Sequence, residues 1–246
     1  MNSLLVSISR VAENQWHAVE NDLVVGRGHA SRRLAGRTFL SIDTWDDAVF
    51  DRLAVAMLTD QPEPVYTVVD ESDRALTAGW ERAGFTTWRR EREYVVPTGP
   101  ASTPIPPGVV ITAAEEDPLR ELDRALRAEI DWPTMPAEVL PWQGGSVPLD
   151  PSTYTVAKLH GQYVGLLRLA TYTRQPRIGL IAVLPSHRHQ GIGHALLDQV
   201  LGDLHHAGTR TVAAEVNETN AAAIALFQRF QARHTNTNLE LVHGKA

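Results

Sequence analysis

The 246-residue sequence contains no cysteine. Disulfide bonds, thiolate metal ligands and a cysteine nucleophile are therefore excluded, and the redox compartment is left open. The sequence also lacks an apolar run approaching the roughly 20 residues of a membrane-spanning helix, and it lacks the basic start and unbroken apolar core of a secretory signal. We therefore expect no membrane partner and a cytoplasmic location.

A surplus of basic residues is lacking as well. The 23 Lys and Arg residues are outnumbered by 29 Asp and Glu residues, which gives a net charge of −6. Proteins that bind nucleic acid through its phosphates present a basic surface, so nucleic acid is not an expected partner. The 43% of apolar and 21% of charged residues are typical of a globular protein, and the length allows two small domains or one large one. The composition does not indicate an oligomeric state.

The clearest local signal is a strand, a turn and a helix between residues 178 and 204. Ile178–Leu184 is an uncharged apolar run, which predicts a strand buried on both faces, and Pro185 ends it. An amphipathic helix is predicted from Gly191 onward. Between the two lies an R-x-x-G-x-G pattern, formed by Arg188, Gly191 and Gly193.

This turn has the chemistry of an anion-binding site. The start of a helix presents unpaired N–H groups and a partial positive charge, and glycines let the backbone approach a bulky anion. Arg188 adds a donor suited to phosphate oxygens, so a pyrophosphate fits. The turn is not a Walker loop, because no Lys-Ser or Lys-Thr follows the glycines, and it lacks the third glycine of the dinucleotide fingerprint. Taken alone, the pattern also fits an ordinary strand-to-helix turn.

A second strand and helix follow at Thr211–Arg229. Thr211–Val216 alternates as a strand does, and Thr219 or Asn220 can cap the helix. The two segments together resemble motifs A and B of the GNAT superfamily of acyl-CoA N-acyltransferases. The run A-E-V-N-E-T-N-A-A-A-I-A-L-F resembles the form found in ribosomal-protein and other protein N-terminal acetyltransferases.

The resemblance implies a binding site for acetyl-CoA as cosubstrate. It places the pantetheine arm along the strand backbone and the pyrophosphate on the amides of the turn, with Asn217 and Asn220 beside the arm; a helix cap alone is the other interpretation of Asn220. It places the donor for the thioester oxygen near Val183. The implied CoA-binding residues are Ile181, Ala182, Val183, Arg188, His189, Gln190, Gly191, Ile192, Gly193, His194, Asn217, Asn220 and Phe227.

The resemblance also implies direct attack of an amine on the thioester. A primary amine is mostly protonated at neutral pH, so a base has to take a proton, and Glu215 stands where related enzymes place one. A solvent-facing or ion-paired strand residue is the other interpretation of Glu215. Phe227 stands where the family normally has a tyrosine that protonates the departing thiolate, and phenylalanine has no hydroxyl for this. CoA then leaves as a thiolate, another group protonates it, or the site is inactive.

Three histidines surround the turn, namely His187, His189 and His194. A metal site is conceivable there, but no acidic cluster joins them, and surface or phosphate-side histidines are the better interpretation. We expect no metal.

The N-terminal part repeats the order strand, helix, strand, helix, strand. Ala75–Phe85 resembles a GNAT motif B that ends in Gly-Phe. No glycine pair stands between Asp43 and Ala48, however, and Asp43, Asp46 and Asp47 would repel a pyrophosphate. We interpret this half as a degenerate GNAT-like unit that does not bind CoA; an unrelated α/β segment is the alternative.

The sequence therefore predicts an α/β protein of two tandem GNAT-like units, each a mixed central sheet flanked by helices. Residues 1–97 form the degenerate unit, 98–107 an extended Pro-rich linker and 108–246 the acetyltransferase domain, in which the irregular stretch Asp131–Asp150 forms the acceptor-side wall. The predicted reaction is acetyl transfer from acetyl-CoA to a primary amine of a small molecule. The alternatives are a protein N-terminal acetyltransferase and a non-catalytic acyl-CoA-binding regulatory protein.

Helices are expected at Asp46–Leu58, from Ser72 or Asp73 to Ala83, and at Pro118–Ile130. A hairpin is expected to turn at His160–Gln162, and Asn238–His243 is expected to be a closing strand.

Overall fold

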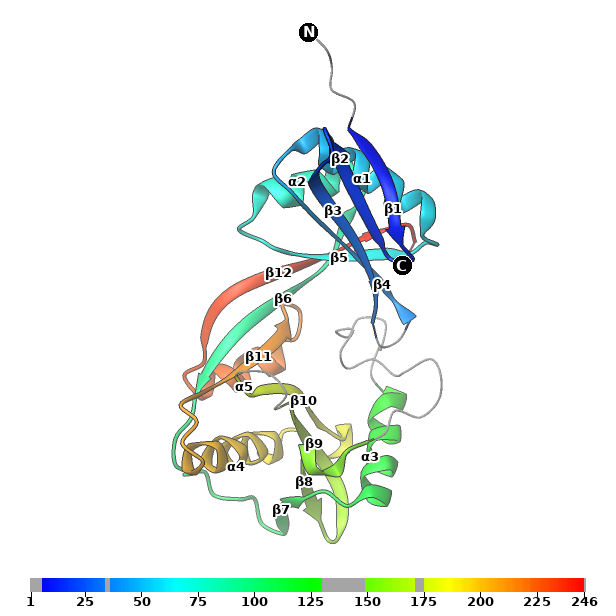
Figure 1. Cartoon of the computed structure of the whole chain (residues 1–246). Coiled ribbons are helices and arrows are strands. Elements are labelled where there is room, and N and C mark those ends of the chain that lie inside the picture. The colour runs from blue at the N-terminus through cyan, green and yellow to red at the C-terminus, as the bar shows by residue number, and fades with distance from the viewer. Residues whose placement is uncertain (1–5, 34–35, 130–148, 171–174, 246) are drawn as a thin grey trace. The chain divides into compact units, whose positions relative to one another are not determined.

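The computed structural model describes residues 6–33, 36–129, 149–170 and 175–245 (Figure 1). The chain divides into two compact units, which are described separately below. Unit 1 contains Met1–Glu91 and Thr237–Ala246, and unit 2 contains Arg92–Asn236. Two strands, β6 and β12, each begin in one unit and end in the other.

Unit 1 is built on a mixed sheet with the strand order β1-β2-β3-β4-β5-β12. Neighbouring strands run antiparallel, except that β4 and β5 are parallel. The elements are β1 Ser7–Ala12, β2 Gln15–Glu20, β3 Leu23–Arg32, β4 Thr38–Thr44, α1 Asp47–Asp60, β5 Val65–Asp70, α2 Arg74–Arg82 and β12 Arg233–His243.

The core of unit 1 lies between this sheet and its two helices. Trp16 from β2 and Trp80 from α2 are both almost fully buried, and Phe50 from α1 packs edge-on against Trp80 at 5.1 Å. Gly28 in β3 lets α1 approach the sheet closely, because a Cβ there would lie 2.4 Å from the sulfur of Met57. Both helices therefore cover the same face of the unit 1 sheet.

Unit 2 also has a mixed sheet, with the strand order β6-β11-β10-β9-β8-β7. Strand β10 is antiparallel to β9 and parallel to β11, while β7, β8 and β9 form an antiparallel meander. The elements are β6 Thr86–Pro97, β7 Val109–Ala113, α3 Glu116–Glu129, β8 Tyr154–Leu159, β9 Gln162–Ala170, β10 Arg177–Val183, α4 Ile192–His206, β11 Thr211–Asn217 and α5 Ala221–Arg229.

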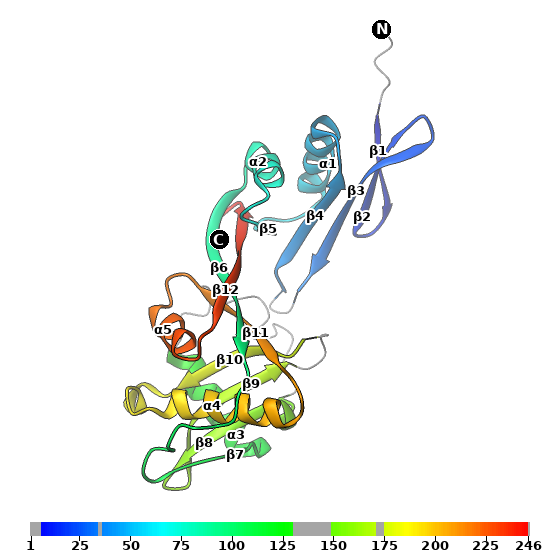
Figure 2. The same cartoon turned by 90° about the vertical axis from the view of Figure 1, so that its left-hand side faces the viewer.

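The helices of unit 2 cover opposite faces of its sheet (Figure 1 and Figure 2). On one face, α3 packs through Leu119, Leu122 and Leu126 against residues of β8 and β9. On the other face, the apolar side chains of α4 and α5 pack against Val212, Ala214 and Val216 of β11 and neighbouring strands. A residue's position in the strand alternation therefore decides which of the two faces it reaches.

The structure confirms an α/β fold with mixed sheets and most of the expected elements. Asp46 caps α1, Asp73 caps α2, and the hairpin β8–β9 turns at His160 and Gly161 with φ of 50° and 84°. Strand β12 begins at Arg233, five residues earlier than expected from Asn238. Its first residues are polar and exposed, so an apolar pattern cannot reveal them.

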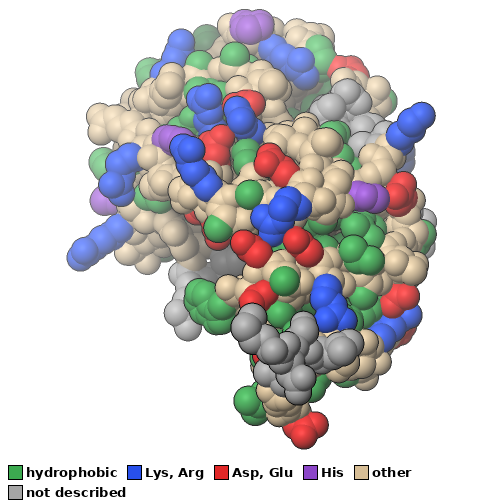
Figure 3. Space-filling model, turned by 90° about the horizontal axis from the view of Figure 1, so that it is seen from above, with side chains coloured by type: hydrophobic (Ala, Val, Ile, Leu, Met, Phe, Trp, Pro, Cys, Tyr) green, Lys and Arg blue, Asp and Glu red, His purple; other side chains and the backbone are tan. Residues whose placement is uncertain are grey.

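The division into domains at residues 97 and 108 remains a prediction. In the structure, the boundary between the compact units lies at Glu91, and the closing strand joins unit 1 after the chain has completed unit 2. None of the helices in the described residues is long and apolar enough to cross a membrane. On the face of the molecule shown in Figure 3, acidic and basic side chains are interspersed.

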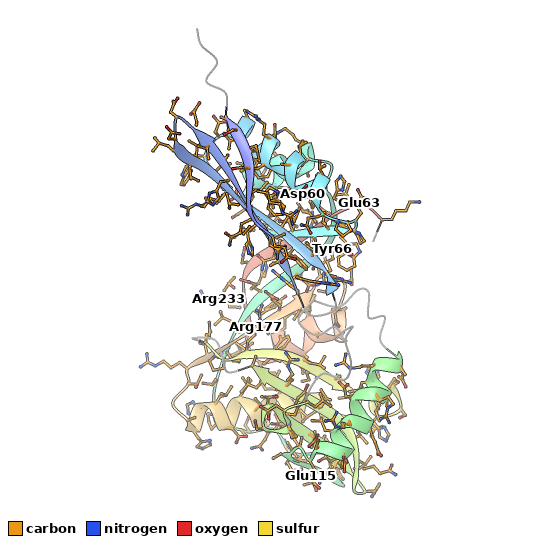
Figure 4. The ribbon with its side chains drawn as sticks, turned by 45° about the vertical axis from the view of Figure 1, so that its right-hand side comes forward. Asp60, Glu63, Tyr66, Glu115, Arg177 and Arg233 are labelled. Atoms are coloured by element: carbon orange, nitrogen blue, oxygen red, sulfur yellow. The ribbon has the colours of Figure 1, made fainter. Side chains whose placement is uncertain are left out.

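Unit 1 contains a buried group of charges at Glu240. One oxygen of Glu240 lies 2.9 Å from Nη2 of Arg89 and the other lies 3.6 Å from Nη1 of Arg37. Burial raises the pKa of Glu240, although both arginines act to lower it. The Arg37 guanidinium also stacks over Tyr66, labelled in Figure 4, and over Trp88, at 5.1 and 4.5 Å from the ring centres. Arg89 is also paired with the buried Glu91 at 3.2 Å, so Glu240 and Glu91 together balance the two guanidinium groups inside unit 1.

Replacing Glu240 with glutamine should destabilise the protein strongly, because two buried guanidinium groups lose their shared anion. We expect the free energy of unfolding to fall by about 3–5 kcal/mol, measured by urea denaturation. Glu71→Gln is the matched control, since its ion pair with Arg90 is about 45% exposed and should contribute less than about 1 kcal/mol. Equal effects of the two substitutions would contradict a structural role of the buried group.

Candidate functional site

The central feature of unit 2 is the divergence of the parallel strands β10 and β11. Their register runs from Arg177–Ala213 to Ile178–Ala214 and ends there, although both strands continue. Beyond Ile178, β10 remains paired with β9 on its other edge as far as Val183. A gap therefore opens between the two strands toward the end of β10.

The backbone of Ile181 and Val183 faces this gap. Leu184 N donates to Val164 O, which makes Leu184 and Val164 a hydrogen-bonded pair of the antiparallel β9–β10 ladder. Such pairs alternate with pairs whose N–H and C=O groups point away from the partner strand. Ile181 and Val183 occupy the outward-pointing positions, so their amides are available on the edge that faces β11.

A β-bulge interrupts the β9–β10 ladder at Gly179. Ile178 is paired with Leu169 and Leu180 with Arg168, so that Gly179 is the extra residue. Ile178 packs on the α4 and α5 side, whereas Leu180 packs on the α3 side. The bulge therefore lies close to the point where β10 and β11 part.

After β10, the chain forms the predicted turn and enters α4. A 3₁₀ turn spans Pro185–His187, and Nε of Arg188 donates to Val183 O at 3.0 Å, which folds this side chain back over the end of the strand. Gly191 has φ of 81° and precedes α4 without any side-chain cap. The first α-helical hydrogen bond runs from Ala195 N to Gly191 O. The amides of Ile192, Gly193 and His194 lie before it and have no preceding helical carbonyl to bond.

The remaining residues of the turn, His189, Gln190 and His194, are described by their backbone conformation and by contacts within the protein. His189 adopts φ of 62°, and Nε2 of Gln190 lies 3.4 Å from Ser186 O. The His194 ring lies 3.1 Å from Oγ1 of Thr103 and packs 4.5 Å from the ring of Phe230. Within the described residues, no group of three or more histidine or acidic side chains is arranged to hold a metal ion.

The expected extended linker is fastened to α4 along its length. Asp198, on α4 and 8% exposed, accepts hydrogen bonds from the amides of Ser102 and Thr103 at 2.8 and 2.7 Å. A Cβ at Gly202 would lie 2.9 Å from Cβ of Ala101, and a Cβ at Gly191 would lie 3.5 Å from the ring of Pro106. The segment is therefore an integral part of unit 2 beside the turn. The sequence pattern missed this because a lone aspartate on a helix gives no signal of its partner.

Glu215 forms an ion pair with Arg177 across the diverging strands (Arg177 is labelled in Figure 4). Both side chains lie on the α3 side of the sheet, since Ile178, Ala214 and Val216 next to them pack on the opposite side. Their side chains are 19% and 32% exposed, respectively. Glu215 is therefore an ion-paired strand residue in this structure. Its carboxylate lies beside the bulge of β10.

Three further predicted residues lie around β11 and α5. Asn220 caps α5 by accepting from Ala223 N at 3.0 Å, and Oδ1 of Asn217 accepts from the amide and hydroxyl of Thr219. Phe227 is 2% exposed in the core and stacks on Tyr94 with ring centres 6.2 Å apart. The stretch Asp131–Asp150, expected to form the acceptor-side wall, lies outside the described residues except for its last two positions.

A family model decides the identity of this arrangement. Residues 116–231, which include α3, the diverging strands, the turn and α5, match the model described as the Acetyltransferase (GNAT) family. This segment belongs to the GNAT acetyltransferase family. The expected resemblance is thereby confirmed at the level of the superfamily, and enzymes of this family use acetyl-CoA as the cosubstrate.

The sequence relatives match only a short part of this chain. The chain is 46% identical over 48 residues to the [ribosomal protein bS18]-alanine N-acetyltransferase of Escherichia coli K12, which is 20% of this chain. It spans about a third (32%) of the length of that relative.

Solved structures with the same fold extend over nearly the whole chain. A GCN5-related N-acetyltransferase from Sphaerobacter thermophilus matches 96% of this chain and 82% of its own, with a TM-score of 0.74 and 17% identity. A tandem GNAT protein from the clavulanic acid biosynthesis pathway matches 94% and 83%, with a TM-score of 0.65 and 13% identity. At these identities, the likeness shows the fold alone.

Loss of the Asp198 carboxylate should release the linker from α4. We expect Asp198→Ala to lower the free energy of unfolding by about 2–4 kcal/mol, because the amides of Ser102 and Thr103 lose a charged acceptor. Urea denaturation measures the effect. Gln199→Ala, one position along the same helix, should change stability by less than about 0.5 kcal/mol. If Asp198→Ala were as mild as Gln199→Ala, the linker would not be held as described.

Proposed function

We propose that unit 2 binds acetyl-CoA in the gap between β10 and β11 and transfers its acetyl group to a primary amine. The observation that supports this most directly is the uncapped start of α4, where the amides of Ile192, Gly193 and His194 lack helical partners. Such amides bind phosphate oxygens well, and glycines at 191 and 193 let a diphosphate come close. Arg188 precedes the turn, and its Nε donates to Val183 O at the end of β10. Binding of acetyl-CoA by calorimetry is the direct test.

In this proposal, the pantetheine arm leaves the turn beside Val183 and runs back along β10 toward Gly179. Its amides pair with the outward-facing backbone of β10 as an added strand would. Of the two amides on this edge, that of Val183 serves the arm. In place of the donor expected near Val183, we propose the amide of Ile181, two residues earlier on the same edge. It lies nearer the reacting end and donates to the thioester oxygen as negative charge develops on it.

The proposed reaction forms an amide bond and breaks the thioester. The deprotonated amine attacks the carbonyl carbon, the tetrahedral intermediate collapses, and CoA departs as a thiolate that takes up a proton. Phe227 cannot supply that proton, and its burial in the core gives it a packing role instead. A thiol has a pKa of roughly 8.5, so a thiolate can leave and be protonated by water.

Glu215 accepts the amine proton, directly or through water, in the proposed mechanism. Its place on the α3 side of the sheet beside the bulge supports this role. Its pairing with Arg177 holds the carboxylate in one orientation.

We propose a small-molecule amine as the acceptor, with a protein N-terminus as the second candidate. The relative from Escherichia coli acts on a ribosomal protein, which favours the second candidate, but the shared part covers only a third of that enzyme. The tandem GNAT likeness in fold favours the first. A non-catalytic acyl-CoA-binding protein is the alternative that Phe227 suggests.

We also propose that unit 1 is a degenerate GNAT-like unit without CoA. Its parallel strands β4 and β5 are paired only at Thr38–Val65 and Phe39–Tyr66, which repeats the divergence of β10 and β11. The start of α1 differs from that of α4, however. The Asp46 carboxylate accepts from the amides of Ala48 and Val49 at 2.8 and 3.0 Å and occupies the place of an anion.

Gly193→Ala should separate ligand binding from stability. A Cβ there would lie 3.7 Å from Val183, an ordinary contact, and alanine is favoured over glycine in a helix by roughly 0.5–1 kcal/mol. We therefore expect unchanged or higher stability, but at least about tenfold weaker acetyl-CoA binding because the methyl group faces the phosphates. Gly202→Ala is the control: it should displace the linker and lower stability. Unimpaired binding by Gly193→Ala would argue against the diphosphate lying on this turn.

Glu215→Gln should lower kcat by about 10²–10⁴-fold while leaving the dissociation constant of acetyl-CoA unchanged, because general-base catalysis contributes on that order. Release of free thiol from acetyl-CoA with a panel of primary amines measures the rate. Glu218→Gln, three residues along, is the matched control and should retain wild-type turnover. If Glu215→Gln kept the wild-type kcat, Glu215 would be only the ion-pair partner of Arg177.

A further inference from the structure

A row of polar side chains crosses the α3 side of the unit 2 sheet. It begins with Tyr154 on β8 and continues with Arg168 on β9, which stands directly opposite Tyr154 in the register. Arg177 on β10 and Glu215 on β11 complete the row. The four residues come from four adjacent strands, and the row ends where β10 and β11 diverge.

Gly179 gives the Arg168 guanidinium its place in this row. A Cβ at Gly179 would lie 3.3 Å from Nε and 3.4 Å from Nη2 of Arg168. The guanidinium therefore lies against the backbone of the bulge, and a larger residue at 179 would push it away. The bulge thus brings a planar cation to the reacting end of the proposed acetyl-CoA arm.

Arg168 differs from the neighbouring arginines in its partner, which is a hydroxyl group and not a carboxylate. Arg177 is paired with Glu215, and Arg127 on α3 is paired with Asp123 at 2.5 Å. Arg168 is hydrogen-bonded to the Tyr154 hydroxyl, which is neutral; burial raises the pKa of this phenol, and Arg168 acts in the opposite direction. In the part of the chain that the structure describes, Arg168 thus forms no ion pair, and the carboxylate whose charge acts on Tyr154, that of Asp123, is itself paired with Arg127.

We propose that Arg168 binds a carboxylate of the acceptor, so that the substrate of this enzyme is an amine that also carries a carboxylate group. The inference rests on the proposed acetyl transfer and adds the class of acceptor to it. A guanidinium presents two parallel N–H donors that match a carboxylate. Because Gly179 is two residues from Ile181, or about 7 Å along the strand, the carboxylate lies only a few bonds from the attacking nitrogen.

The same row explains how such an acceptor would be oriented. With its carboxylate on Arg168, the amine would lie toward the Arg177–Glu215 pair and within reach of the base. The Tyr154 hydroxyl accepts a hydrogen bond from Arg168 and so fixes the orientation of its guanidinium group. Arg168 is therefore a residue that contacts substrate, and Tyr154 is a positioning residue.

Thioether derivatives of CoA test the proposal without knowledge of the natural acceptor. CoA is alkylated at sulfur with arms of one to four methylenes that end either in a carboxylate or in the matching carboxamide. The two series share the nucleotide and the pantetheine arm and differ only in the charge of the end group. Calorimetry then gives the dissociation constant of each compound for wild-type protein, Arg168→Gln, Arg168→Lys and the surface control Arg120→Gln.

We expect wild-type protein to bind at least one carboxylate compound about tenfold more tightly than its carboxamide, as a charge-assisted hydrogen bond would give. Arg168→Gln should remove this preference without changing the affinity for CoA itself, Arg168→Lys should keep part of it, and Arg120→Gln should keep all of it. Unchanged CoA affinity also shows that the variants are folded.

Equal binding of the carboxylate and carboxamide compounds by wild-type protein, or a preference that survives in Arg168→Gln, would overturn the assignment of Arg168. Those outcomes leave the proposed acetyl-CoA site intact, because CoA still binds. Failure of wild-type protein to bind CoA at all would instead overturn the proposed function and this inference with it.

Discussion

The structure of unit 2 depends on two parallel strands that part after two residue pairs. A continued β10–β11 ladder would satisfy the backbone of β10 on both edges and would leave no room for a ligand. Because the ladder stops at Ile178–Ala214, the amides of Ile181 and Val183 face a gap, while pairing with β9 keeps β10 in the sheet as far as Val183. The end of β10 therefore keeps a fixed position although one of its edges is unpaired, since β9 holds it on the other edge.

The start of α4 continues this unpaired edge. The chain passes from the end of β10 through the turn to Gly191, and the helix begins without a side-chain cap. A side chain that capped these amides would stabilise the helix by about 1 kcal/mol, so leaving them open is a local loss of stability, at the place where we propose that the diphosphate binds. The linker bonded to Asp198 and the packing of α4 on the sheet compensate for that loss.

The sequence predicted the structure best where neighbouring residues in the chain determine an element by themselves. The apolar run of β10, the glycines of the turn and the alternation of β11 each predict an element from adjacent residues, and the family model agrees with them. Contacts between distant residues were not predictable in this way. The contact of Asp198 with the linker depends on which segment packs beside α4, and the contact of Arg168 with Gly179 depends on strand register and a bulge. No pattern of adjacent residues encodes either. The choice between a free and an ion-paired Glu215 depended likewise on Arg177, 38 positions earlier in the chain.

Comparison of the two helix starts gives the physical basis for assigning different roles to two similar halves. Both units place a helix after a strand that diverges from its parallel neighbour. In unit 1, the Asp46 carboxylate lies on the first amides of α1, so a phosphate would have to displace an attached anion and then sit beside Asp47. In unit 2, Gly191 leaves the corresponding amides without a competing side chain. This difference in the residue at the cap, aspartate in unit 1 and glycine in unit 2, is why we propose the cosubstrate site in unit 2 alone.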